Sequence, residues 1–136
     1  MITRDSDMNP ELLVAIDEIK SAFPESGVDY LDNGDGSIWV TVSSVYIGKQ
    51  WVPSSSTISF GIGAQYPYAE CYPHYLDPSL KKADGSPHGE AIHPNNQTPR
   101  GDAAVMVSRV NRQFGDVPDT AAIKLVKVVD WLRSRE

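Results

Sequence analysis

The sequence predicts an α+β fold in which an N-terminal and a C-terminal helix pack on one antiparallel β-sheet. Three observations predict it: helical periodicity near both ends of the chain, two-residue alternation between residues 28 and 62, and turn-rich segments elsewhere. At 136 residues, of which 40% are hydrophobic, the chain can bury the core of a single domain. We expect that domain over residues 9–136, after a flexible N-terminus of residues 1–8.

Both predicted helices carry a start signal and an apolar stripe. In "NPELLVAIDEIKSAF", Asn9 can cap the helix and Pro10 suits its first position. In "PDTAAIKLVKVVDWLRSRE", Asp119 or Thr120 is the expected cap. The stripes recur at helical spacing and consist of Leu12, Ile16, Ile19 and Phe23 in the first helix and Ala122, Leu125, Val129 and Leu132 in the last.

An antiparallel meander is predicted between the helices. "GVDYLDNGDGSIWVTVSSVYI" contains two strands around the glycine-rich turn "DNGDG". Apolar residues alternate with other side chains in two segments and predict one buried face: Ile38, Val40 and Val42, then Ile58, Phe60 and Ile62. "QYPYAECYPHYLDPSL" contains three prolines, so we expect a stiff edge strand or an extended segment there.

Residues 81–102 are rich in Gly, Pro, Asn and Asp and show no periodicity. They predict a long loop, and long loops in compact domains often carry function. The next segment, "AAVMVSRV", is strand-like.

Charge and composition exclude several classes of function. The formal net charge is −6 and the longest basic cluster is Lys81-Lys82, so no nucleic-acid partner is expected. No apolar run approaches the roughly 20 residues of a membrane helix, and the first residues lack the apolar core of a signal peptide. The single cysteine, Cys71, fits a reducing compartment. We therefore expect a cytoplasmic protein with no membrane partner.

A zinc site is a weaker alternative. The four candidate ligands have the spacings C-x2-H and H-x4-H and are Cys71, His74, His88 and His93. Pro73 lies inside the first pair, and the second pair lies in the predicted loop. The favoured prediction therefore contains no metal and no other cofactor, and Cys71 is expected to be a small buried apolar residue.

Ser108 is a candidate nucleophile because it follows an apolar run and is followed directly by Arg109. A serine hydroxyl needs a base or a preorganised site before it can attack an acyl group. The candidate supports are His93, Asp102, Asp116 and Asp119, and sequence spacing alone does not bring any of them to Ser108. The "HPNN" segment, 93–96, also offers Asn95, whose amide could stabilise an oxyanion, although composition alone favours a plain turn.

Two segments, "YPYAECYPHYLDPSLKKADG" and "VSRVNRQFGDVPDT", resemble bacterial proteins similar to ubiquitin-conjugating enzymes (E2), called prokaryotic E2 family E. The resemblance covers about residues 57 to 133. The matching positions are Tyr66-Pro67-Tyr68-Ala69, Pro78, Leu80, Asp84-Gly85, Ser108-Arg109, Phe114, Pro118 and Asp119. It implies an E2-like fold with an N-terminal helix, a meander, an "HPN" turn in a long active-site loop and a C-terminal helix.

The resemblance also implies a function and its partners. Such proteins are encoded beside a ubiquitin-like protein, an E1-like adenylyltransferase and a deconjugating peptidase. The first helix, with exposed Asp17, Glu18 and Lys20, is then the expected E1-facing element.

The site departs from the eukaryotic pattern, which has a thioester cysteine shortly after "HPN". This chain has no cysteine after Cys71. Judged by its distance from "HPN", the position equivalent to that cysteine is Ala103 or Ala104. Judged by its distance from the aromatic residue and the proline that precede the last helix, it is Ser108. Val110 takes the place of the histidine expected after Ser-Arg.

Two functions follow from the resemblance. In the first, Ser108 carries the C-terminus of the ubiquitin-like protein as an oxyester. Asn95 and backbone N–H groups near Gly101 would stabilise the oxyanion, His93 is the candidate base, and Arg109 would orient the incoming tail. In the second, the chain is an inactive scaffold that binds the ubiquitin-like protein or its E1.

Overall fold

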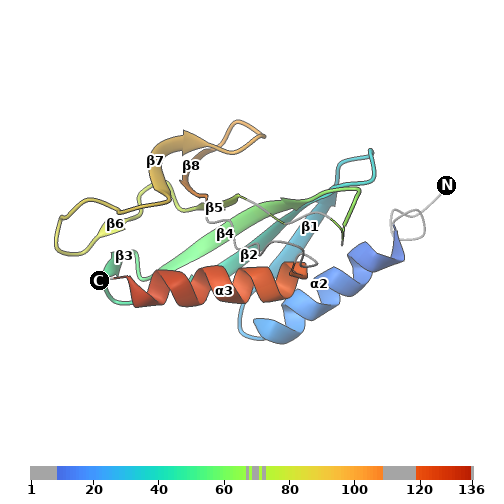
Figure 1. The fold of residues 1–136 in the computed structure, drawn as a ribbon, viewed down its shortest axis with the longest axis horizontal. Coiled ribbons are helices and arrows are strands. Elements are labelled where there is room, and N and C mark those ends of the chain that lie inside the picture. Colours follow the sequence, from blue (N-terminus) through green and yellow to red (C-terminus); the bar gives the residue numbers. More distant parts are fainter. Residues whose placement is uncertain (1–8, 67, 69–70, 72, 109–118, 136) are drawn as a thin grey trace.

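The computed structural model describes residues 9–66, 68, 71, 73–108 and 119–135. These residues form the predicted α+β fold, with a helix near each end and strands between them (Figure 1). The elements are α2 (Pro10–Ala22), β1 (Val28–Asp32), β2 (Ile38–Tyr46), β3 (Trp51–Val52), β4 (Ser55–Ile62), β5 (His74–Leu76), β6 (Lys81–Lys82), β7 (Ile92–Gln97), β8 (Ala103–Val107) and α3 (Ala121–Ser134). The expectation for residues 1–8 lies outside the described part of the chain.

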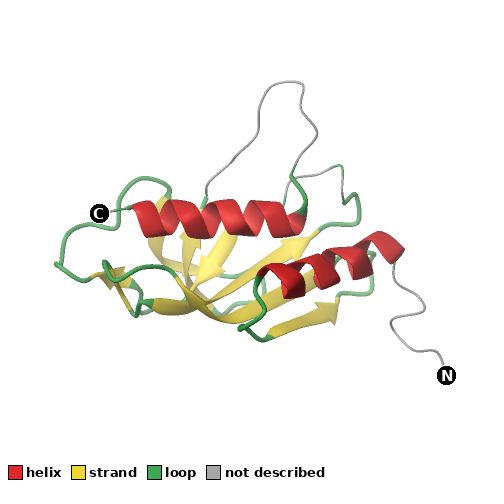
Figure 2. Cartoon of the chain, turned by 90° about the horizontal axis from the view of Figure 1, so that it is seen from below, coloured by secondary structure: helices red, strands yellow, loops and turns green. Residues whose placement is uncertain are grey.

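The main sheet has six strands in the order β1-β2-β4-β5-β8-β7, and every neighbouring pair is antiparallel. Strands β3 and β6 form a separate two-stranded sheet. Helices α2 and α3 lie on the same side of the main sheet (Figures 1 and 2). The sheet therefore has a helix-covered inner face and an uncovered outer face. Neither described helix is long and apolar enough to cross a membrane.

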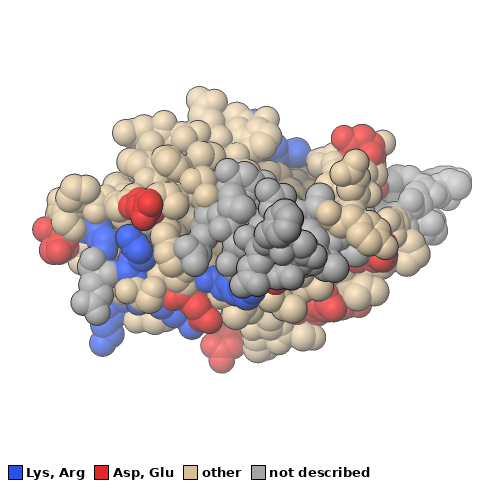
Figure 3. Space-filling view, in the orientation of Figure 1, with Lys and Arg blue, Asp and Glu red and all other residues tan. Residues whose placement is uncertain are grey.

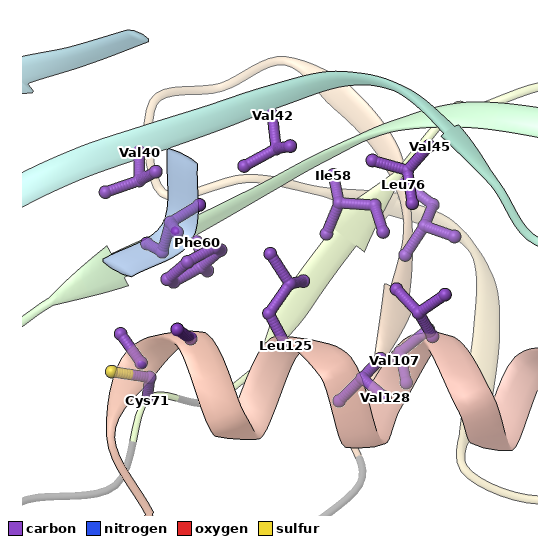
Figure 4. Close-up of a cluster of buried hydrophobic side chains, with 14 of the residues drawn as sticks. Val40, Val42, Val45, Ile58, Phe60, Cys71, Leu76, Val107, Leu125 and Val128 are labelled. Atoms are coloured by element: carbon purple, nitrogen blue, oxygen red, sulfur yellow. The ribbon is translucent and has the colours of Figure 1, made fainter. Parts of the chain in front are cut away.

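The core lies between the inner face and the two helices, as the alternation predicts. Val40 and Val42 of β2 and Phe60 of β4 are completely buried. Leu125 and Val128 approach them from α3 (Figure 4). Both predicted stripes pack into this core, except that Phe23 ends α2 and is only partly buried. Cys71 is buried there too, as expected for a small apolar side chain.

The helix caps follow the predicted chemistry. The Asn9 side chain accepts a hydrogen bond from the backbone N–H of Glu11 at 2.9 Å. At α3 the cap is Thr120, which accepts from the N–H of Ile123 at 3.3 Å. Basic side chains gather where α3 ends, close to acidic ones (Figure 3). Arg133 lies in that last turn, where a cation favours the negative end of the helix dipole.

Strand β5 corrects the prediction of an edge strand. It lies inside the sheet, between β4 and β8. It is only three residues long, and Pro73 and Pro78 lie just outside it. The prolines therefore limit the length of the strand without interrupting its pairing.

The prediction of one long loop over residues 81–102 is also wrong, because β6 and β7 lie within it. The "HPNN" segment belongs to β7, which pairs with β8 as a hairpin at the sheet edge. His93 pairs with Met106, and the next pair is Asn96 with Ala104. Two residues, Pro94 and Asn95, thus face one residue of β8 in a β-bulge. An edge strand tolerates proline because its outer N–H groups need no partner.

Candidate functional site

The outer face of the sheet carries a continuous row of cross-strand partners. The row runs across β2, β4, β5, β8 and β7 and consists of Thr41, Ser59, Tyr75, Met106 and His93. Directly paired residues of an antiparallel sheet point to the same face. All five side chains therefore point away from the helices.

Ser108 joins this row at its β7 end. It follows β8 directly, two residues after Met106, and so lies on the same face as His93. The distance between His93 Nε2 and Ser108 Oγ is 2.8 Å. The backbone N–H of Ser108 donates to the carbonyl of Ala91 at 2.8 Å, which holds the serine against the start of β7. Ser108 is half-buried and His93 is exposed.

This contact has the geometry of a nucleophile and its base. In the tautomer protonated on Nδ1, the His93 Nε2 lone pair accepts the hydrogen bond from the Ser108 hydroxyl. The contact lies within the range over which a histidine removes a proton from an attacking hydroxyl. Among the described residues, no carboxylate binds His93 Nδ1, so the arrangement is a dyad rather than a triad.

The predicted acidic supports do not join the dyad. Asp119 pairs with Lys127 at 3.1 Å, next to the start of α3. Asp102 precedes β8, at the opposite end of that strand from Ser108. Asp116 lies outside the described residues.

The predicted oxyanion groups are placed less favourably. Asn95 is exposed in the bulge with a φ of 63°, and no hydrogen bond joins it to Ser108 among the described residues. The expectation for Gly101 is wrong, because its N–H donates to the carbonyl of Thr98 in the β7–β8 turn, far along the hairpin from Ser108. Arg109 lies outside the described part of the chain.

The four zinc candidates are scattered. Cys71 and His74 are buried, His88 Nε2 contacts the carbonyl of Leu80 at 2.6 Å, and His93 contacts Ser108. Within the described ranges, no group of three His, Cys, Asp or Glu side chains is arranged to hold a metal ion.

His74 is an ionisable group whose environment the sequence did not predict. Its side chain is completely buried against the ring of Phe60, with a centroid separation of 4.8 Å. Neither ring nitrogen has a hydrogen-bond partner among the described residues. Burial, reinforced by the charge of Lys124, lowers the pKa of His74 to about 3. The side chain is therefore neutral at physiological pH.

The outer face also contains a cavity that sequence reasoning missed. It has a volume of about 240 Å³, and its lining includes Trp39, Thr41, Ser59 and Tyr75. The outward-facing residues of the alternation in β2 and β4 are the sequence signal for this lining.

Comparisons with known proteins add no relative. No protein-family model matches the chain, and neither the curated proteins nor the solved structures include a match. The E2 likeness therefore rests on the sequence motifs.

Proposed function

We propose that this protein is an E2-like carrier that accepts the C-terminus of a ubiquitin-like protein from an E1-like enzyme as an oxyester on Ser108. The observation that carries the proposal is the 2.8 Å contact between Ser108 Oγ and His93 Nε2 on the uncovered face of the sheet. Cys71 is an unsuitable carrier because it is 2% exposed. The buried thiol cannot reach a partner's activated tail without local opening of the core.

The acyl transfer uses only groups of this site and of the incoming tail. Ser108 Oγ attacks the activated carbonyl carbon while His93 Nε2 takes the hydroxyl proton. A new C–O bond forms, the bond from that carbon to the E1-side leaving group breaks, and the leaving group receives the proton from His93. Transfer from Ser108 to an acceptor amine repeats the exchange, with Ser108 as the leaving group.

The fold is compatible with the partners that the motif resemblance suggests. The N-terminal helix α2 exposes Asp17, Glu18 and Lys20, as required of an E1-facing element. It packs beside α3 on the inner face, whereas Ser108 and His93 lie on the outer face. In this proposal the E1 contact and the acyl site use different surfaces.

The test mixes the protein with a candidate E1-like enzyme, its ubiquitin-like protein and ATP. The expected product is a covalent adduct that survives reductant and is cleaved by hydroxylamine or base. Ser108→Ala abolishes it, and His93→Gln slows its formation by roughly 100-fold or more because the base is lost. The matched control is Ser55→Ala, which removes an exposed hydroxyl from β4 and leaves the adduct unchanged.

The alternative function is the inactive scaffold. It is favoured by Ala104, which lies near the cysteine position counted from "HPN" and has no reactive group. Stable binding of the ubiquitin-like protein without any adduct supports the scaffold. An adduct that persists in Ser108→Ala contradicts the assignment of Ser108.

A further inference from the structure

The outer-face cavity lies between strands β2, β4 and β5 and the β7–β8 hairpin of the same sheet. Strands β2, β4 and β5 supply the sheet side, and Thr98, Asp102 and Ala104 of the hairpin supply the other side. The volume of about 240 Å³ is smaller than the roughly 300–1,000 Å³ of pockets for drug-sized ligands. It suits one side chain or one small polar group.

Two aromatic rings line this cavity. The rings of Trp39 and Tyr75 have centroids 5.9 Å apart and planes inclined by 42°. Aromatic faces attract cations, and tryptophan does so most strongly. Both residues therefore contribute aromatic surface to the lining of the cavity.

Tyr75 adds a hydroxyl group to the lining of the cavity. The residue is 8% exposed, and no hydrogen bond to its hydroxyl occurs within the described ranges. The hydroxyl reaches solvent, so it is free to form a hydrogen bond with a group that enters the cavity.

The remaining lining combines apolar side chains with carboxylates and hydroxyl groups. Asp77 and Asp102 both line the cavity, and its lining contains no Lys, Arg or His among the described residues. Thr41 Oγ1 and Ser59 Oγ lie 3.3 Å apart and offer acceptor oxygens. The nearby Arg100 donates instead to Asn33 Oδ1 at 3.4 Å. The lining therefore favours a cation over a neutral or anionic group.

We propose that this cavity binds one ammonium or guanidinium group, presented as a lysine or arginine side chain of a partner polypeptide. The site is distinct from the acyl carrier, because neither Ser108 nor His93 lines the cavity. It goes beyond the proposed function and does not depend on chemistry at Ser108.

The experiment follows the indole N–H of Trp39 and the amides of Ser59 and Tyr75 by NMR. The probes are N-acetyl-lysine methylamide and N-acetyl-arginine methylamide, with the norleucine and citrulline analogues as neutral controls. We expect saturable shifts with both cationic probes, weaker binding at high ionic strength, and much weaker binding of the neutral analogues. The same titration of Ser108→Ala gives the same affinity, so failure here is distinguishable from failure of the acyl-carrier proposal.

Variants locate the bound probe. Asp77→Asn and Asp102→Asn each weaken binding by about three-fold, since each removes an exposed ion pair. The matched control is Asp130→Asn, which makes the same charge change on α3 and leaves the affinity unchanged. Arg100→Ala tightens binding slightly by removing a nearby positive charge.

Three results would overturn the proposal: no saturation with either cationic probe, equal binding of the neutral analogues, or equal weakening in Asp130→Asn. As a separate arm, free 1,4-diaminobutane is titrated in the same way. Tighter binding of the diamine than of either capped amino acid contradicts a polypeptide source.

Discussion

The two faces of the main sheet are built from the same strands but carry different side chains. On the inner face, Val40, Val42 and Phe60 are 0% exposed and pack against the helices. On the outer face, Thr41 and Ser59, which lie between these positions along the strands, remain partly exposed. The comparison shows that two-residue alternation divides each strand: the inner face packs against the helices, and the outer face is free to carry polar groups.

His74 is an ionisable side chain on the otherwise largely apolar inner face. It pairs with Val107 of β8 and lies in the core where an apolar residue is expected. Its ring nitrogens gain no hydrogen bond within the described residues. The inner face therefore contains a side chain that the hydrophobic core tolerates only when it is neutral.

The largest expected effect is the loss of stability when a side chain that packs against the inner face is shortened. Leu125→Ala should reduce the free energy of unfolding by about 3 kcal/mol, because the completely buried side chain leaves a cavity. The matched control is Ile123→Ala on the same helix, whose side chain is 49% exposed and should cost under about 1 kcal/mol. Urea denaturation measures both, and equal losses would contradict the assignment of Leu125 to the core and of Ile123 to the exposed side of α3.

The next prediction concerns the loss of stability at acidic pH. The folded pKa of His74 is about 3, below its ordinary value of 6.5, so the unfolded chain takes up the proton first. The contribution of His74 to stability is complete above pH 6.5 and is lost as the pH falls toward 3. The slope from this group approaches about 1.4 kcal/mol per pH unit.

His74→Leu isolates that contribution. We expect a shallower loss of stability with acid and unchanged or higher stability at neutral pH, because no hydrogen bond is removed. Denaturation of both proteins at a series of pH values across this window provides the measurement. Parallel curves for the two proteins would show that His74 is not protonated on unfolding.

The smallest expected effect lies on the outer face. Ser108→Ala and His93→Gln should each change the free energy of unfolding by under about 1 kcal/mol, because an exposed hydrogen bond contributes little. Thermal denaturation checks this result. A loss as large as that of Leu125→Ala would assign the dyad a structural role instead of a chemical one.

Local patterns were sufficient to predict the helices, the first strands and the inner face. Leu12, Ile16 and Ile19 recur at helical spacing, and Ile58 and Phe60 alternate, so each segment reveals its buried side without its neighbours. The position of strand β5 was not predicted, because three residues between prolines are too few to show a period. Its place inside the sheet depends on pairing with β8, which is distant in sequence.

The candidate site could be named but not assembled from the sequence. Ser108 and His93 were singled out as chemical groups, yet they are 15 residues apart and meet only because the β7–β8 hairpin folds back. The "HPNN" segment did not predict a strand because its bulge interrupts the alternation. The cavity was missed for a different reason, since it gathers residues from β2, β4, β5 and the hairpin.

The bulge at Pro94 and Asn95 has a consequence for how this edge of the sheet tolerates change. In a regular strand, residues three apart point in opposite directions. Here the extra residue allows both side chains to point to the outer face. His93 pairs with Met106 there, and Asn96 pairs with Ala104. Insertion of one more residue between them in β7 would reverse the alternation on one side of the insertion. Either the imidazole of His93 or the amide of Asn96 would then point toward the core. The spacing between these two positions is therefore constrained more tightly than the identity of the residues between them.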